Sequence, residues 1–379
     1  MVRSQHFILS CVTWPLALGA LLVACSGESR DVSRANGDGG APAFVTGDSA
    51  RDETGAGAVG AVTPGSACAT ASAGATRPPV HLVFMYDRSF SMGFAVGSTT
   101  VWEACKAGLS AFFASPSSSG LHASLAFFGK DDTLDSALTC SASSYATPEV
   151  PMTALPNGTL FANAIGATKP FTGTPTLPAL TGAIQYAKKV KAGLAPNEKV
   201  AVVLVTDGAP TGCTDNTLTT VHDAAQSAAQ AAIPTYVVGI GKVANLQTIA
   251  SGGGTTAVEV STTSPAQVTT DIEAALGQIG AAELGCEYAL PPPPAGQAID
   301  VNAVNVNYTP ANGSATTLPY SATCADAGGW HYDNVQAPTK IVACPASCAT
   351  LEADRGGKMD IIFGCTTSIP PGGAPPIPK

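Results

Sequence analysis

Two apolar runs, each ending in an acidic residue, constrain the fold of this chain most strongly. Val80–Tyr86 is followed by Asp87, and Val200–Val205 is followed by Thr206 and Asp207. Largely continuous apolar runs, without strict polar alternation, are typical of parallel strands covered on both faces. Open α/β sheets place their ligand sites at the carboxyl ends of such strands. The two acids are therefore expected at one functional edge of a buried sheet.

Hydroxyl side chains follow Asp87 at every second position. Ser89 and Ser91 complete an Asp-x-Ser-x-Ser pattern. Carboxylate and hydroxyl oxygens are hard ligands, which suit Mg²⁺, Mn²⁺ or Ca²⁺. Taken alone, the pattern also fits an ordinary Asx or Ser turn.

A third segment offers another hydroxyl ahead of an expected helix. The turn Phe171–Thr176 contains Gly and Pro, and helical periodicity follows from Leu177 to Val190. Thr174 lies in this turn. Its alternative role is a helix N-cap, for which Thr172 and Thr176 are equally suitable.

Together the three segments resemble the metal-ion-dependent adhesion site of von Willebrand factor type A domains, and they occur in that family's order. The resemblance implies a doubly wound, mostly parallel α/β sheet over residues 79–285. It implies an ion, Mg²⁺ or alternatively Mn²⁺ or Ca²⁺, with one position left for a carboxylate from a protein partner. Phe90 departs from the family, which often has Gly between these ligands. The implied metal ligands are Asp87, Ser89, Ser91, Thr174 and Asp207.

The order of expected elements favours the same fold independently of the motif. Strands are expected at 81–86, 123–128, 200–206, 235–240 and 257–260. Helices are expected at 101–114, 160–166, 177–190, 218–231, 244–251 and 265–279. Strands that alternate with helices of this length favour a doubly wound α/β sheet.

Residues 1–24 resemble a bacterial lipoprotein signal peptide. Arg3 precedes an apolar run from Phe7 to Ala24, which is too short for a secure membrane span and ends in small residues before Cys25. The resemblance implies that Cys25 is lipidated and holds the chain at a membrane of the bacterial cell envelope, for example the outer membrane on its periplasmic or surface face. An ordinary secretory signal or an uncleaved anchor is the alternative.

Residues 25–78 are expected to form a flexible tether. Gly, Ala, Ser and Thr dominate this segment, so it cannot bury enough apolar surface to offset its ordering entropy. The net charge of the chain is −9, which argues against nucleic acid as a partner.

Nine of the eleven cysteines follow Cys25, and an oxidising compartment should pair most of them. Nine is odd, so at least one thiol stays free. Cys105 is the expected one, because it lies in the expected helix 101–114 and can pack there as a small apolar side chain.

Two bridges are expected at the α/β domain. Cys140 and Cys213 would brace the edge that carries the metal loop. Cys68 and Cys286 would clasp the domain, because its ends lie close together in the fold that the resemblance implies.

After residue 285 the sequence predicts a small disulfide-rich β domain, at residues 286–379. Pro291–Pro294 favours an extended polyproline conformation, and short strand patterns follow at 299–308, 328–332, 340–343 and 359–364. Trp330 and Tyr332 are expected in its core or edge rather than in a contact patch. Zinc binding by Cys344 and Cys348 is an alternative to disulfides, although no pair of histidines lies nearby.

The predicted function is adhesion or assembly through a protein ligand, without enzymatic activity. A metal-dependent hydrolase is one alternative, but it needs a positioned water and usually a general base, and neither His nor an additional Glu accompanies the three motif segments. A structural envelope protein with an unused site is the other. The isolated His81, His122 and His222 are expected to be structural.

Overall fold

The computed structural model describes residues 45–46, 67–75, 78–131, 136–171, 173–195, 198–291, 298–325, 328–354 and 357–377. The predicted signal peptide and the predicted lipidation site Cys25 lie outside the described residues. So does most of the predicted tether.

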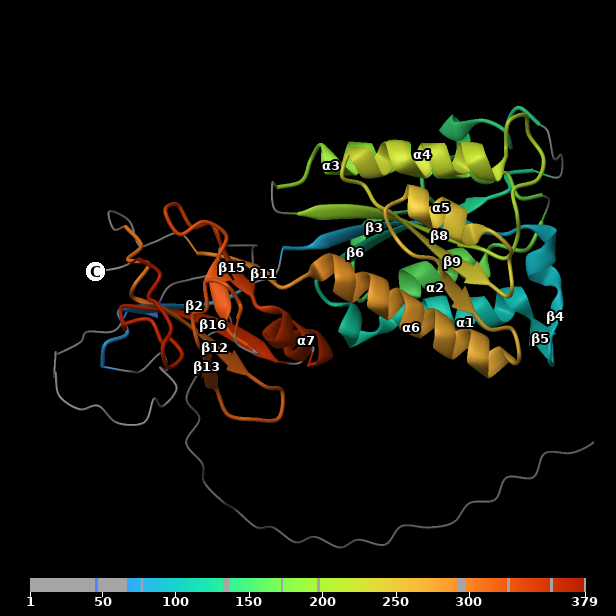
Figure 1. Ribbon diagram of the computed structural model, residues 1–379. Coiled ribbons are helices and arrows are strands. Elements are labelled where there is room, and N and C mark those ends of the chain that lie inside the picture. The colour runs from blue at the N-terminus through green and yellow to red at the C-terminus, as the bar shows by residue number, and fades with distance from the viewer. Residues whose placement is uncertain are drawn as a thin grey trace, which may run out of the picture. The chain divides into compact units, whose positions relative to one another are not determined.

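A six-stranded sheet is the framework of the α/β domain, and its strand order is β10-β9-β8-β3-β6-β7 (Figure 1). Five strands run parallel, and β7 is antiparallel at one edge. The order reverses between β3 and β8, which is the position where open α/β sheets bind ligands. The predicted doubly wound, mostly parallel sheet is thereby confirmed. The strands are β3 (Val80–Asp87), β6 (Leu121–Phe128), β7 (Val150–Ala154), β8 (Lys199–Thr206), β9 (Thr235–Ile240) and β10 (Val258–Val260).

The two central strands are buried because helices cover both faces of the sheet. In β3, Leu82 and Phe84 pack on one face, and Val83 and Met85 pack on the other. The first face is covered by α1 (Val101–Ala114), α2 (Gly158–Gly166) and α6 (Pro265–Leu284); the second is covered by α3 (Thr176–Lys191), α4 (Leu218–Gln230) and α5 (Leu246–Gly252).

Local sequence signals fix the ends of several helices. Thr100, Thr217 and Ser264 each accept a backbone N–H bond at the start of a helix, as N-cap residues do. Gly108 permits close packing of α1 on α6, since a Cβ there would lie 2.8 Å from the Thr269 carbonyl oxygen. Short elements complete the domain: η1 (Phe90–Gly93), β4 (Ala95–Val96), β5 (Thr99–Thr100), η2 (Pro116–Ser118) and η3 (Ala142–Tyr145).

The β domain contains two antiparallel sheets, with orders β1-β2-β16-β12-β13 and β11-β15-β14. Trp330 and Tyr332 are buried in its core, as predicted, and the Trp330 indole N–H donates to the Leu318 carbonyl at 3.0 Å. The elements are β1 (Val45–Thr46), β2 (Ala71–Gly74), β11 (Glu287–Ala289), β12 (Val304–Thr309), β13 (Thr316–Leu318), β14 (Trp330–Tyr332), β15 (Lys340–Ala343), α7 (Pro345–Ala353) and β16 (Lys358–Phe363).

The predicted tether requires a correction, because strands β1 and β2 both lie within residues 25–78 and pair with each other. Residues 71–74 form strand β2, which pairs with β16 in the register Ala71↔Phe363. Ala, Ser and Gly have low strand propensity, so no local pattern identifies this strand, and its pairing partner lies almost 300 residues away. In sequence, the α/β domain is therefore an insertion between β2 and β11 of the β domain.

One of the two predicted disulfides is correct. Cys140 pairs with Cys213, with Cα atoms 5.5 Å apart. Cys105 is a buried free cysteine, as predicted, and burial raises the pKa of its thiol.

The predicted Cys68–Cys286 bridge is wrong. Cys68 pairs with Cys365, because β2 lies beside β16 and brings residue 68 to the end of that strand. Cys286 pairs with Cys348 of α7. The remaining bridge joins Cys324 to Cys344, so neither Cys344 nor Cys348 has the thiolate that zinc requires.

Two histidines that are isolated in the sequence are neighbours in the sheet. His81 and His122 occupy paired positions near the amino ends of β3 and β6, and their Nδ1 atoms lie 3.3 Å apart. His81 Nε2 lies 3.2 Å from a carboxylate oxygen of Glu198. Burial and the neighbouring His81 ring lower the pKa of His122. The pair is at the end of β3 opposite Asp87, so it is remote from the acids.

We predict that replacing both Cys68 and Cys365 with Ala destabilises the β domain by about 2–5 kcal/mol. The bridge restricts the unfolded chain because it closes a span of 297 residues. The measurement is hydrogen exchange at the amides of β2 and β16. The matched control replaces Cys140 and Cys213 with Ala, which should leave these amides unchanged. Equal exchange in β2 with and without the Cys68–Cys365 bridge would contradict the prediction.

Candidate metal centre

Asp87 and Asp207 are brought together by two adjacent parallel strands. Asp87 is the last residue of β3, and Asp207 directly follows β8. The two strands are paired up to Tyr86↔Val205, so both acids leave the sheet at the same edge. The sequence pattern therefore becomes a cluster at the point where the strand order reverses.

The Asp87 carboxylate is fully buried and held from two sides. Its Oδ1 accepts a hydrogen bond from the Ser89 backbone N–H at 2.7 Å, and its Oδ2 accepts one from the Thr206 hydroxyl at 2.5 Å. These bonds fix the orientation of the carboxylate. Thr206 was expected only as part of the strand end, yet it positions this acid.

The two serines of the Asp-x-Ser-x-Ser pattern face Asp207. The Ser91 hydroxyl donates to Asp207 Oδ1 at 2.7 Å, and the Ser89 hydroxyl lies 3.3 Å from the same oxygen. The two hydroxyl oxygens are 3.0 Å apart. A continuous cluster of oxygen atoms thus joins the loop after β3 to the loop after β8.

Thr174 lies at the same cluster, and the expected alternative as a helix cap does not hold. The N-cap of α3 is Pro175, without a side-chain cap bond, and Thr172 lies outside the described residues. Thr174 is buried, and a Cβ placed on Gly208 would lie 3.5 Å from its Oγ1 and 3.9 Å from Ser91 Oγ. The structure thereby brings all five predicted residues to one edge of the sheet.

Asn216 ties the Thr174 loop to the loop after β8, and the sequence gives no signal of this role. Its side-chain NH₂ group donates to the carbonyls of Thr174 and Thr211, both at 3.0 Å, and its Oδ1 accepts from the Leu177 N–H at 2.8 Å. The Thr174 and Thr211 segments also exchange two direct bonds, of 3.0 and 2.9 Å. The Cys140–Cys213 bridge adds a covalent brace to the same loop.

The two acids are unfavourable neighbours without a counter-charge. Burial, together with the charge of Asp207, raises the pKa of Asp87 to about 7. Burial also raises the pKa of Asp207, although the Ser91 and Ser89 hydroxyls oppose this shift. Both pKa shifts indicate that the ionised carboxylates are less stable in this site than in water.

The nearest basic side chain in sequence does not neutralise the acids. Arg88 donates through Nε to the Gly129 carbonyl at 2.5 Å and through Nη2 to the Lys130 carbonyl at 3.3 Å. Within the described part of the chain, none of the ion pairs includes Asp87 or Asp207.

The donor set fits a hard divalent cation. Two carboxylates and three hydroxyls match the oxygen preference of Mg²⁺, Mn²⁺ and Ca²⁺. The glycine at position 208 keeps the space beside Thr174 and Ser91 clear of a side chain. A bound cation would supply the positive charge that the two acids lack.

A known protein family matches the α/β domain. Residues 81–273 match the von Willebrand factor type A domain. The chain belongs to the von Willebrand factor type A (VWA) domain family. Its membership indicates a domain for adhesion or protein binding in general terms. No curated protein sequence matches the chain.

Solved structures with a similar fold come from distant proteins. BatB from Bacteroides thetaiotaomicron is 18% identical, with 52% of this chain and 98% of that chain covered and a TM-score of 0.36. The pilus adhesin SpaC from Lactobacillus rhamnosus GG is 14% identical, with 77% and 41% covered and a TM-score of 0.42. The manganese-loaded TRAP protein of Plasmodium vivax is 15% identical, with 53% and 76% covered and a TM-score of 0.36.

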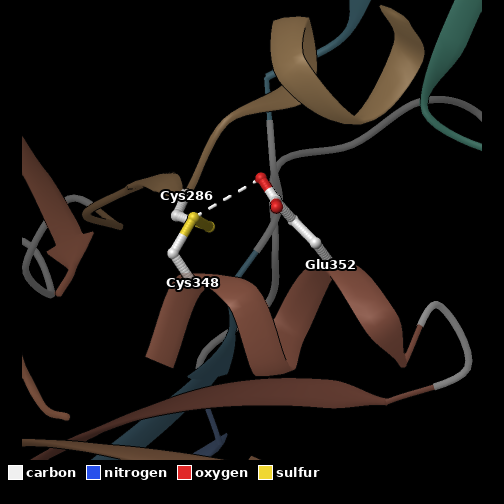
Figure 2. Close-up of side chains that lie close together, drawn as sticks. All are labelled: Cys286, Cys348 and Glu352. Atoms are coloured by element: carbon white, nitrogen blue, oxygen red, sulfur yellow. Dashed lines mark hydrogen bonds between the residues drawn. A yellow bond between two sulfur atoms is a disulfide. The ribbon is translucent and has the colours of Figure 1, made fainter. Parts of the chain in front are cut away.

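A second cluster of potential metal ligands lies in the β domain, outside the VWA domain. Cys286, Cys348 and Glu352 place their ligand atoms within 4.8 Å of one another, and Glu352 Oε1 lies 3.5 Å from Cys348 Sγ (Figure 2). The two cysteines are joined in a disulfide, so neither is a thiolate. This cluster is therefore a covalent staple rather than a metal site.

No helix in the described part of the chain is long and apolar enough to cross a membrane.

We predict that Asp87→Asn stabilises the metal-free VWA domain at pH 8. The pKa of Asp87 is about 7 in the folded state and 3.8 in its ordinary state. The folded state therefore holds the proton more tightly, and metal-free stability falls as the pH rises from about 4 to about 7. The Asn side chain does not ionise, so the variant keeps the free energy of unfolding that wild type loses, on the order of 2–4 kcal/mol.

The measurement is hydrogen exchange of the β8 amides in EDTA at pH 5 and pH 8, corrected for intrinsic exchange rates. Asp223→Asn is the matched control, because Asp223 is an exposed acid on α4. A pH dependence that is the same in wild type and Asp87→Asn would contradict the prediction.

Proposed function

We propose that the chain captures a protein partner through a divalent cation held by its VWA domain. Two neighbouring carboxylates carry this proposal: Asp87 is buried, Asp207 is partly buried, and neither has a basic partner among the described residues. Burial raises the pKa of both groups, so a bound cation would offset the cost of their negative charge. Mg²⁺ is the expected ion, and Mn²⁺ or Ca²⁺ are the alternatives. The proposed ligands are Asp87, Ser89, Ser91, Thr174 and Asp207.

The composition of the site favours binding of an acidic group from outside. Mg²⁺ takes six ligands in an octahedron, and five side chains leave at least one position open even if all of them bind directly. Three of the five are neutral hydroxyls, so the ion would keep part of its charge. Once bound, the ion would act as an electrophilic bridge to a carboxylate of the partner.

We place this activity in the bacterial cell envelope, with Cys25 as the lipidated anchor. The support is the signal-like segment before Cys25 and the four disulfides among the described residues, which suit an oxidising compartment. The chain between Cys25 and strand β1 would serve as a spacer between membrane and folded domains.

We predict that wild type binds Mg²⁺ or Mn²⁺ in calorimetry, and that Asp87→Ala lowers the affinity by about 100-fold or more. Removing the acid deletes one of only two charged ligands. The matched control Asp223→Ala should bind as wild type does. Equal heats for wild type and Asp87→Ala would exclude this site.

The same titration carries a pH test. Because the pKa of Asp87 is about 7 without metal, binding below that pH must displace a proton. The affinity should fall by up to about tenfold for each pH unit below about 7. Heats measured in buffers of different ionisation enthalpy should report the released proton.

We predict that the purified full chain retains a partner from envelope extract in Mg²⁺ and releases it in EDTA. Asp87→Ala should retain none, and Asp223→Ala should match wild type. Equal retention by wild type and Asp87→Ala would instead favour a structural role with an unused site. Metal-dependent turnover of ester, phosphate or peptide substrates that stops in Asp207→Ala would favour the hydrolase.

A further inference from the structure

Exposed aromatic side chains are concentrated at the metal centre. Among the described residues, the large apolar side chains that are exposed are Phe90, Phe94, Leu138, Leu160, Phe171, Ile369 and Ile377. The three phenylalanines of this set lie in the segments that carry Ser89, Ser91 and Thr174. Phe90 is 70% exposed, Phe94 is 58% exposed and Phe171 is 42% exposed. Such clustering is a mark of an interaction surface, whereas single exposed apolar residues are ordinary.

Phe90 and Phe94 project from a fixed turn. Phe90 begins η1 and Phe94 directly follows it, and the fully buried Met92 side chain anchors this turn. The Met92 and Phe94 N–H groups donate to the carbonyls of Ser89 and Ser91 at 3.1 and 2.9 Å. The two phenyl rings contact each other edge to face, with centroids 5.8 Å apart. Their geometry is therefore set before any partner arrives, which lowers the entropy cost of binding.

Phe171 is held to the loop after β3 through its contacts with Arg88. Its N–H donates to the Arg88 carbonyl at 2.5 Å, and the Arg88 guanidinium carbon lies 5.7 Å from its ring centroid. Arg88 is itself tied to the carbonyl of Gly129. Phe171 is thus held at the loop that carries Phe90, although it lies about 80 residues further along the chain.

We propose that Phe90, Phe94 and Phe171 form an aromatic collar that selects partners in which the metal-binding Asp or Glu is flanked by large apolar side chains. This inference rests on the proposed function, because the partner's acid is what brings those flanking residues to the collar. A metal alone accepts any accessible carboxylate, so neighbouring contacts must supply the discrimination. Aromatic side chains give large rigid contact areas of this kind.

A protein segment suits the collar better than a lipid surface does. The chain carries a net charge of −9, which opposes approach to an anionic membrane. Arg88, which contacts Phe171, donates through Nε and Nη2 to backbone carbonyls, so these donors do not face a phosphate group.

The test is a selection of phage-displayed random peptides on the immobilised full chain in Mg²⁺, with elution by EDTA. Four forms are compared: wild type, Phe90→Ser/Phe94→Ser/Phe171→Ser, Asp87→Ala, and the matched control Leu160→Ser/Ile369→Ser/Ile377→Ser. All substituted apolar side chains are exposed, and circular dichroism checks that each form is folded.

Wild type and the control should enrich peptides with an acid that has large apolar residues within two positions. The collar variant should still enrich acids, but without apolar neighbours, and it should bind a synthetic wild-type-selected peptide about tenfold more weakly or worse. Asp87→Ala should yield no EDTA-eluted enrichment.

Two results would overturn the collar. Acids enriched by wild type without apolar neighbours would refute it and leave the proposed metal-dependent capture intact, whereas no EDTA-eluted peptides from wild type would refute both. In a parallel assay, sedimentation with phosphatidylglycerol vesicles that is lost only in the collar variant would assign the three side chains to lipid and refute the peptide preference.

Discussion

The parallel pairing of β3 with β8 is the constraint on which the site depends. It places two acids from positions 87 and 207 side by side, at the edge where the strand order reverses. A sheet of buried apolar strands stabilises this arrangement even though the acids disfavour each other. The unfavourable charge is visible in the raised pKa values of both carboxylates. The fold thus tolerates a local electrostatic cost, as functional sites often do.

Much of the VWA domain could be predicted from sequence because its signals are local. Apolar runs gave the central strands, and helical periodicity gave α1 with the same bounds as the structure. The edge strand β7 was missed, since Val150–Ala154 contains Pro and is only partly buried. Four of the five proposed ligands follow from strand ends and the Asp-x-Ser-x-Ser pattern. Thr174 was predicted only from the resemblance to the family. Nothing in the sequence identifies Asn216 or Thr206, whose roles arise from contacts between loops distant in the chain.

The β domain was less predictable because its key pairings are non-local. Strand β2 has small residues and belongs to a sheet formed mostly by residues after 303. The Cys68 pairing failed for the same reason: the segment was assigned to the wrong domain. Cys140–Cys213 was predictable because both cysteines follow elements whose carboxyl ends meet at one sheet edge. Each disulfide prediction therefore succeeded or failed with the assignment of its two cysteines to a domain.

Rigid loops would allow the proposed metal site to stay open beside the proposed aromatic collar. The Thr174 loop and the loop after β8 are held together by the Asn216 bonds and by the Thr174–Thr211 pair, and a disulfide braces the latter loop. The loop after β3 is tied to them through the Ser91–Asp207 hydrogen bond. Ordering these loops during folding removes an entropy cost that binding would otherwise carry. It also keeps Phe90, Phe94 and Phe171 from collapsing over the acids, because Met92 and Arg88 fix their backbones. A partner would therefore meet a preformed surface in which one charged contact is surrounded by apolar ones.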